Sequence, residues 1–246
     1  MSARLTPAQT AAALRQPSAQ TPVRQSLAPA ATTTARRGAK APSAPAAPAG
    51  KTAGKAAAPS GAGEIRIIGG QWKRTRLPVP SLPGLRPTPD RVRETLFNWL
   101  GQDLAGWRCV DAFAGTGALG LEAASRGAAA VQMVEQDAAL VARLQLLCQR
   151  LRASAVQLRR GDGVAQLRQC APASQDLVFI DPPFDSPLFV PALQAAAAAL
   201  VPQGFIYLEA PAAWDDAALA PLGLSLQRHL RAGAVHAHLL RLAAAV

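Results

Sequence analysis

Residues 108–120 read RCVDAFAGTGALG and carry the strongest structural signal in this chain. An apolar strand, residues 108–113, leads into a glycine-rich turn, and the residues after the turn are typical of a helix. Gly115, Gly117 and Gly120 match the pattern GxGxxG, and glycine allows backbone N–H groups to approach a ligand closely. The stretch therefore predicts a strand, a turn and a helix that bind a ligand at the turn.

The chain after this unit alternates between short strands and helices. Further strands are expected over residues 130–135, 155–159, 176–180 and 205–209, helices over 118–126, 138–151, 164–169 and 191–200, and a terminal strand pair over 225–230 and 234–242. Such alternation is typical of a parallel sheet with helices on both faces, and the terminal pair predicts an antiparallel hairpin at one edge. Ligands bind such sheets beyond the carboxyl ends of the strands, so functional residues are expected directly after strands.

Acidic residues follow the first three predicted strands. Asp111 ends the first strand, four residues before the first glycine of the turn, where it would meet a cation better than a pyrophosphate. Glu135 ends the second strand, and a carboxylate there can accept both hydroxyls of a ribose. Asp162 follows the third strand and suits the N-cap of the next helix. The glycine turn and Glu135 fit a nicotinamide or flavin cofactor as well as other nucleoside cofactors.

Residues 181–184 read DPPF and directly follow the apolar strand 176–180. Two prolines fix the backbone so that the Asp181 carboxylate, the Pro182 carbonyl and the Phe184 ring lie in a small arc. An amino group on a base ring is a poor nucleophile because its lone pair is delocalised, and two acceptors on its hydrogens favour the pyramidal, reactive form. Phe184 can stack on the base and hold it for attack. The motif is typical of amino-group methyltransferases.

Two further motifs precede the first strand of the sheet. Residues 69–79 read GGQWKRTRLPV, and residues 86–100 read RPTPDRVRETLFNWL. Together with DAFAGTGALG and DPPF in this order, they resemble the 16S rRNA (guanine(966)-N(2))-methyltransferase family over about residues 64–242. The resemblance implies a Rossmann-like class I methyltransferase fold with a seven-stranded, mostly parallel sheet. It also implies methyl transfer from S-adenosylmethionine to the N2 amine of a guanine in 16S ribosomal RNA, within a 30S subunit or an assembly intermediate.

The resemblance also assigns roles to residues. The cofactor-binding residues it implies are Asp111, Phe113, Gly115, Thr116, Gly117, Glu135 and Asp162, and the catalytic residues are Asp181, Pro182, Pro183 and Phe184. In the family pattern the acid at Asp162 contacts the adenine amino group of the cofactor, and this role is compatible with helix capping. No metal is expected, because the sulfonium already carries an activated methyl group.

Basic residues gather before the first strand of the sheet. Residues 63–85 predict a short basic hairpin, and the expected RNA-binding residues are Arg66, Trp72, Lys73, Arg74, Arg76, Arg86, Arg91 and Arg93. Basic side chains with an aromatic ring suit an RNA backbone and an unstacked base. A solvated charged face with no partner is the alternative.

A helix follows this basic hairpin. Thr88 and Pro89 are expected as its N-cap and its first residue. Its apolar positions are expected to face the core, with Arg91 and Arg93 on another side.

The chain has 246 residues and a formal net charge of +11. Residues 1–63 hold eight of the basic residues and neither Asp nor Glu, with few large apolar side chains. We predict a disordered basic tail over residues 1–62 and one methyltransferase domain over residues 63–246. The basic balance favours a polyanionic partner. The acid-poor composition of the tail also resembles an organelle transit peptide, which is the alternative interpretation.

Several classes of protein are excluded by composition. The sequence has no apolar stretch long enough to span a membrane, and its three cysteines lack CxxC spacing, so neither a disulfide framework nor a zinc site is expected. We predict a cytoplasmic monomer. His229, His236 and His238 lie on the terminal strands and are interpreted as surface or packing residues.

Three other functions remain possible at this point. A DNA adenine or cytosine amino-methyltransferase would share DPPF, but it needs a base-reading domain for which the chain has little room. A nicotinamide oxidoreductase would share the glycine pattern and would leave DPPF unexplained. A non-catalytic RNA-binding assembly factor would not need Asp181.

Overall fold

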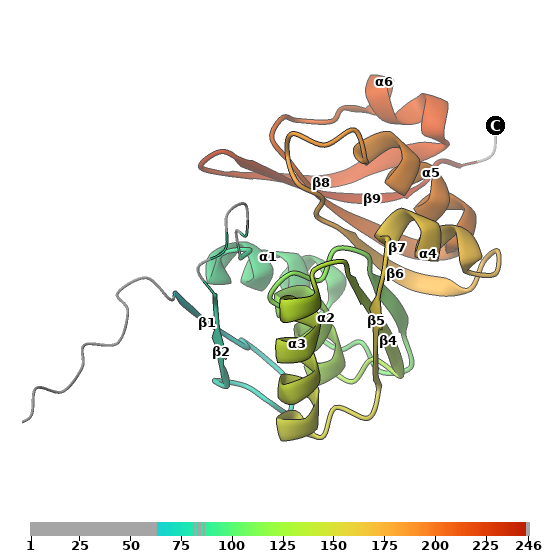
Figure 1. Ribbon diagram of the computed structural model, residues 1–246. Helices are drawn as coiled ribbons and strands as arrows, with labels where there is room; N and C mark the ends of the chain where they lie inside the picture. The colour runs from blue at the N-terminus through green and yellow to red at the C-terminus, as the bar shows by residue number, and fades with distance from the viewer. Residues whose placement is uncertain (1–62, 81, 83–84, 86, 245–246) are drawn as a thin grey trace, which may run out of the picture. The chain divides into compact units, whose positions relative to one another are not determined.

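The structure is a computed structural model that describes residues 63–80, 82, 85 and 87–244. The predicted tail, residues 1–62, and Arg86 lie outside the described residues. The described part contains one seven-stranded sheet, in the order β5-β4-β3-β6-β7-β9-β8 (Figure 1). Its strands are β3 Arg108–Asp111, β4 Ala130–Glu135, β5 Val156–Arg160, β6 Gln175–Ile180, β7 Leu200–Ala210, β8 Leu224–Ala232 and β9 Val235–Leu242.

The direction of the strands matches the prediction. Strands β5, β4, β3, β6 and β7 run parallel to one another. Strand β9 is antiparallel to both β7 and β8, and β8 forms the edge of the sheet. The Rossmann-like, mostly parallel sheet with an antiparallel C-terminal hairpin is therefore confirmed.

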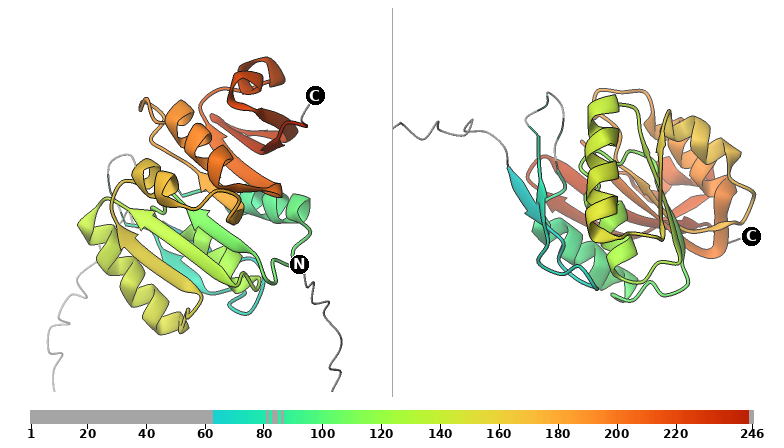
Figure 2. Two further views of the ribbon diagram at one scale, coloured as in Figure 1. Left: turned by 90° about the vertical axis from the view of Figure 1, so that its right-hand side faces the viewer. Right: turned by 60° about the horizontal axis from the view of Figure 1, so that its bottom comes forward.

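Helices cover both faces of this sheet. They are α1 Asp90–Leu100, α2 Ala118–Ser125, α3 Ala138–Leu151, α4 Gly163–Gln169, α5 Phe189–Ala199 and α6 Asp216–Leu219, with a 3-10 turn at Ala220–Leu222. Helices α1, α2 and α3 pack on one face, and α4 and α5 pack on the other. Figure 2 shows α3 and α5 on opposite sides of the strands.

The last four residues of strand β6 show why the buried part of a central strand is apolar. Leu177 and Phe179 point into the core beneath α1 and α2, whereas Val178 and Ile180 point into the core beneath α4 and α5. All four side chains are fully buried. A parallel strand that is buried on both faces has no polar alternation. The first polar residue after it, Asp181, therefore marks the carboxyl end of the strand.

The predicted elements differ from the observed ones mainly at their ends. Strand β4 and helix α3 begin and end where predicted. Strand β7 is longer than the predicted 205–209, because a register shift lets its first residues pair with the start of β6. The short helix α6 was not predicted, because a four-residue helix carries no periodic signal.

Helix α1 requires two corrections. It begins at Asp90, so Pro89 is the N-cap and the Thr88 side chain makes no capping hydrogen bond. The Thr88 side chain instead lines the same cavity as Glu209, and its hydroxyl lowers the pKa of the Glu209 carboxyl. The placement of Arg93 away from the core is also wrong, because its side chain is fully buried.

The predicted N-terminal hairpin is present. Strand β1, Glu64–Arg66, pairs antiparallel with β2, Arg76–Pro78. Ile65 and Leu77 are buried, while their neighbours along each strand are exposed. The hairpin therefore presents one apolar face to the α1–α3 side of the core and turns its basic side chains outward. None of the described helices is long and apolar enough to span a membrane.

Candidate active site

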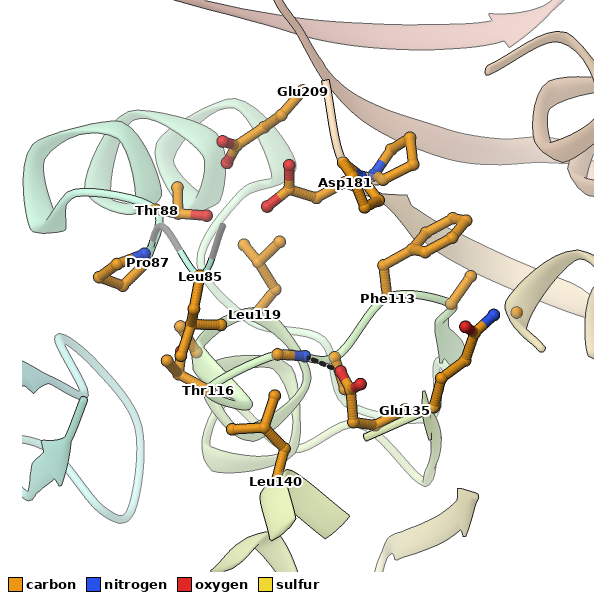
Figure 3. A pocket seen from close by; sticks show the side chains of 18 of the residues that line it. Leu85, Pro87, Thr88, Phe113, Thr116, Leu119, Glu135, Leu140, Asp181 and Glu209 are labelled. Carbon is orange, nitrogen blue, oxygen red and sulfur yellow. Dashed lines mark hydrogen bonds between the residues drawn. The ribbon is translucent and has the colours of Figure 1, made fainter. Parts of the chain in front are cut away.

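A cavity of about 710 Å³ lies beyond the carboxyl ends of β3, β4, β6 and β7 (Figure 3). This volume falls within the range of pockets that enclose small organic ligands. The predicted site residues that line it are Phe113, Gly115, Thr116, Glu135, Asp181, Pro182, Pro183 and Phe184. The fold thus brings the glycine turn, the acid after β4 and the DPPF motif to one cavity.

Glu135 connects the end of β4 to the glycine turn. Its Oε2 accepts a hydrogen bond from the Gly115 backbone N–H at 2.8 Å (Figure 3). Its Oε1 accepts from the Asp137 N–H at 2.8 Å. Gly115 has a φ of +53°, which favours glycine and turns its N–H toward the carboxylate. The turn is therefore held in place before any ligand binds.

Asp111 lies behind the turn and does not line the cavity. It is fully enclosed, and its Oδ2 accepts a hydrogen bond from the Gly120 N–H at 2.9 Å. Burial raises the pKa of Asp111 to about 7, although backbone N–H groups oppose the rise. The structure gives Asp111 a positioning role at the first turn of α2, and its direct contact with a cofactor stays a prediction.

Gly117 and Asp162 also lie outside the lining of this cavity. Gly117 has a φ of +81°, and a Cβ there would lie 2.6 Å from Leu144, so packing alone requires the glycine. Asp162 is exposed, and its Oδ1 accepts from the Ala165 N–H at 2.6 Å as the N-cap of α4. The capping role predicted for Asp162 is confirmed, and its contact with an adenine stays a prediction.

Asp181 is half-buried at the end of β6, where it faces the cavity. Burial, together with the nearby carboxylates of Glu209 and Asp111, raises the pKa of Asp181 well above its usual range. A carboxylate of raised pKa accepts hydrogen bonds and protons more readily. Pro182 and Pro183 follow without a cis peptide bond and lead to Phe184 on the same wall of the cavity.

Glu209 is a site residue that the sequence analysis missed. It lies near the end of β7, is 3% exposed and lines the cavity opposite Asp181 (Figure 3). The Tyr207 hydroxyl donates to its Oε1 at 2.8 Å. The signal was available in the sequence, because residues 205–209, FIYLE, end an apolar strand with an acid as the DPPF strand does.

The residues expected to bind RNA are mostly exposed. Lys73 and Arg74 lie exposed in the turn between β1 and β2, and Arg91 is exposed on α1. Arg66 and Arg76 form ion pairs with Asp90 at 3.6 Å and Glu64 at 3.1 Å, yet about two thirds of each arginine side chain stays exposed. Trp72 is half-buried and packs against the core, so part of its ring is available.

Arg93 must be removed from the RNA-binding residues. Its guanidinium is fully buried and bonds to Glu122 at 3.1 Å, to Asp90 at 2.6 Å and to the Arg66 carbonyl at 2.8 Å. Its Nε donates to the Thr88 carbonyl at 3.2 Å. The physical reason is that Arg93 of α1 faces the second half of α2, where Glu122 is buried and needs a cation.

Glu122 also fixes the N-terminal hairpin to α2. Its two oxygens accept backbone N–H groups of Ile68 at 2.8 Å and Gly69 at 2.7 Å. The Ser125 hydroxyl donates to the Gly69 carbonyl at 2.6 Å and accepts from the Trp72 N–H at 2.9 Å. The exposed basic turn is therefore attached to the helix that follows the glycine turn.

The three histidines form a stacked group on β8 and β9. His238 is buried, and its Nε2 accepts from the Trp214 N–H at 3.0 Å. Burial lowers the pKa of His238 to about 4, so the ring is neutral near pH 7. The rings of His229 and His236 stack with centroids 5.1 Å apart. The interpretation of His238 as a packing residue is confirmed.

Comparison with known proteins decides the family. A family model described as conserved hypothetical protein 95 matches residues 65–241. Ribosomal RNA small subunit methyltransferase D from Haemophilus influenzae is 41% identical over 158 residues, which cover 61% of this chain and 81% of that protein. The chain belongs to the family of these proteins.

Other relatives agree with this family. The protein of the same name from Escherichia coli K12 is 50% identical over 125 residues, 51% of this chain, and the chain spans 63% of its length. A solved structure described as the putative methyltransferase yhhF from Escherichia coli is 39% identical. It superposes with a TM-score of 0.64 over 74% of this chain and 100% of its own. The predicted family and fold are confirmed.

Proposed function

We propose that the protein transfers a methyl group from S-adenosylmethionine to the N2 amine of a guanine in 16S ribosomal RNA. The observation that carries the proposal is the convergence of the DPPF motif with Glu135 and the glycine turn on one cavity. A second support is that the relatives from Haemophilus influenzae and Escherichia coli are named ribosomal RNA small subunit methyltransferases.

The cofactor side of the cavity fits S-adenosylmethionine. The Glu135 carboxylate, already oriented by two backbone N–H groups, retains lone pairs for ribose hydroxyls. Apolar side chains of Phe113, Leu119 and Leu140 line the wall around it and suit a flat adenine ring. When bound, the cofactor supplies a methyl group activated by a sulfonium, so the protein has no need to provide an electrophile.

The substrate side is formed by the DPPF motif. The Asp181 carboxylate and the Pro182 carbonyl are the two acceptors that would hold the hydrogens of an exocyclic amine. Methylation would form a bond from the methyl carbon to N2, break the bond from that carbon to the sulfonium sulfur so that S-adenosylhomocysteine leaves, and release one proton from N2. Asp181 or water can take this proton, and the raised pKa of Asp181 favours the transfer to it. Phe184 would stack on a base that has left its own stack.

The N-terminal hairpin would hold the RNA next to the cavity. Lys73, Arg74 and Arg91 are exposed cations on the elements that precede the sheet. Such side chains bind phosphates and position the RNA, and they do not read its sequence. The 30S context, the monomeric state and the cytoplasmic location remain predictions.

A methyl-transfer assay tests the proposal. Wild-type protein with labelled S-adenosylmethionine is offered 30S subunits, naked 16S RNA and duplex DNA, and the modified nucleoside is identified by mass. We expect N2-methylguanosine from ribosomal RNA, a loss of at least about 100-fold in Asp181→Ala, and no loss in the exposed carboxylate variant Glu94→Ala. Label in DNA or in another base would contradict the proposed substrate. Cofactor binding without any transfer would favour a non-catalytic assembly factor.

A further inference from the structure

Two carboxylates meet at the substrate side of the cavity, and the chemistry proposed above uses one of them. Strands β6 and β7 run parallel with Ile180 opposite Leu208, so Asp181 and Glu209 are the next neighbours along this register. Both line the cavity, and Figure 3 shows their carboxylates directed toward each other and toward the space between them. Glu209 therefore stands beside the position expected for the reacting amine.

Glu209 is held as a hydrogen-bond acceptor. The Tyr207 hydroxyl donates to it at 2.8 Å, and the Thr88 hydroxyl group also lies on this side of the cavity (Figure 3). Burial raises the pKa of Glu209, whereas these two hydroxyls and the buried Arg93 oppose the rise. A carboxylate has about four lone-pair sites, so the two hydroxyls leave acceptor capacity free on the side that lines the cavity.

We propose that Glu209 accepts the ring N1–H of the target guanine while Asp181 accepts a hydrogen of its N2 amine. This inference rests on the proposed function and adds to it the residue that selects the base. Guanine carries N1–H and the N2 amine side by side, so two adjacent acceptors match two adjacent donors. Both donors lie on the Watson–Crick edge of guanine, and enzymes that act on an extruded base commonly read it by hydrogen bonds to this edge.

The same pair of carboxylates discriminates against other amino-bearing bases. Adenine and cytosine carry an unprotonated ring nitrogen beside their amino group, and its lone pair would face the Glu209 carboxylate. A buried acceptor that meets no donor has no hydrogen bond from the ligand and none from water, which makes binding of these bases unfavourable. DPPF by itself accepts any exocyclic amine, and Glu209 restricts the choice to guanine.

The test compares guanine with 2-aminopurine at one position of an RNA. The base that the wild type methylates is mapped first, and two synthetic RNAs are then made that differ only in carrying guanine or 2-aminopurine there. 2-Aminopurine keeps the amine and lacks the ring N1–H. Wild type, Glu209→Gln and Tyr207→Phe are compared by kcat/KM on both RNAs, and cofactor affinity is measured by calorimetry as a check on folding.

We expect the wild type to prefer the guanine RNA by about 100-fold or more. Glu209→Gln should lose at least about tenfold on guanine and narrow the preference to about tenfold or less, because the glutamine amide can donate to the bare N1. Tyr207→Phe should show a smaller change in the same direction, and cofactor affinity should stay unchanged.

The inference is overturned if Glu209→Gln keeps the wild-type preference for guanine over 2-aminopurine. Either kcat/KM is then unchanged on both RNAs, or it falls by the same factor on both, which indicates a structural role. Absence of N2-methylguanosine from the wild type contradicts the proposed function itself, which separates that failure from the failure of Glu209.

Discussion

Arg93 and Glu122 form an ion pair within the core, with Nη1 and Oε2 3.1 Å apart and neither side chain exposed. Glu122 also accepts from Arg126 at 2.9 Å, so one carboxylate compensates two buried cations. Its remaining capacity is taken by backbone N–H groups of the N-terminal hairpin. This one carboxylate joins α1, α2 and the basic turn.

Glu122→Gln should therefore destabilise the protein strongly. The substitution keeps the shape and leaves Arg93 and Arg126 with much less compensation, which costs about 3–5 kcal/mol of unfolding free energy. Urea denaturation followed by circular dichroism measures the loss. The matched control is Arg108→Ala, which breaks the partly exposed pair with Asp176 and should have a much smaller effect. Equal effects of the two substitutions would mean that the buried network is not important for stability.

Gly70 should tolerate alanine less well than Gly233. Both have positive φ, at +73° and +63°, so both substitutions introduce backbone strain of about 1 kcal/mol. A Cβ at Gly70 would lie 1.8 Å from the Ser125 carbonyl oxygen, whereas a Cβ at Gly233 meets nothing within 4 Å. Gly70→Ala must therefore detach the turn from α2. Hydrogen exchange over residues 67–75 should accelerate in Gly70→Ala, and unchanged exchange would contradict the docking of this turn.

The sequence predicted those features that depend on local patterns. Strand β4, helix α3 and the DPPF motif each lie within a short window of periodic or distinctive residues. Arg93 was misplaced because its partner Glu122 is 29 residues away on another helix. A basic residue on an amphipathic helix normally faces water, and only the packing of α1 on α2 reverses that preference.

Glu209 was missed for a related reason. Its importance comes from the pairing of β7 with β6, which places it beside Asp181. The sequence places acids at or directly after the ends of several strands, but it does not indicate which of these strands are neighbours. Similarly, the glycine turn was expected to contact a ligand throughout, whereas packing of Gly117 against Leu144 explains part of the pattern.

Asp111→Asn should stabilise the protein at neutral to alkaline pH. Burial raises the pKa of Asp111 to about 7, above the value of about 3.9 for an unfolded chain. The folded state therefore binds more protons than the unfolded state in this window, and stability falls as pH rises from about 4 to about 7. Asparagine removes the ionisation and keeps an acceptor for the Gly120 N–H. We expect a gain of about 1–3 kcal/mol at pH 8 and a shallower pH dependence.

Asp176→Asn should change the stability in the opposite direction and destabilise the protein. Partial burial raises the pKa of Asp176, but hydrogen bonds and charge from Arg108 outweigh it and lower the pKa overall. This carboxylate therefore stabilises the fold above its unfolded pKa and loses that effect as pH falls. Thermal unfolding across pH 4 to 8 should show Asp111→Asn above the wild type and Asp176→Asn below it at the alkaline end. A change of stability in the same direction in both variants would refute the opposite pKa shifts assigned to Asp111 and Asp176.

Glu135→Ala should lower the affinity for the cofactor and have a smaller effect on the free energy of unfolding. Removing the carboxylate deletes the expected ribose acceptor and frees the N–H groups of Gly115 and Asp137. We expect a loss of tenfold or more in S-adenosylmethionine affinity, about 1.4 kcal/mol or more, by isothermal titration calorimetry. The S-adenosylmethionine affinity of Glu135→Gln should lie between those of the wild type and Glu135→Ala, because the amide retains one acceptor oxygen. Glu94→Ala, on the exposed side of α1, is the control, and wild-type affinity in Glu135→Ala would place the ribose elsewhere.

Lys73→Ala combined with Arg74→Ala should reduce the salt dependence of RNA binding. Each phosphate contact that is lost reduces the magnitude of the slope of log K against log salt by about 0.7–0.9, so the loss of two contacts reduces it by about 1.4–1.8. Cofactor affinity should not change, because both side chains lie in the turn between β1 and β2. Arg168→Ala is the matched control, since its exposed cation sits on α4 at the opposite face of the sheet. Fluorescence anisotropy with a 16S RNA fragment at several salt concentrations gives the slopes. If Arg168→Ala changes the slope as much as the hairpin variant does, the basic turn is not the RNA-binding surface and the attraction comes from net charge alone.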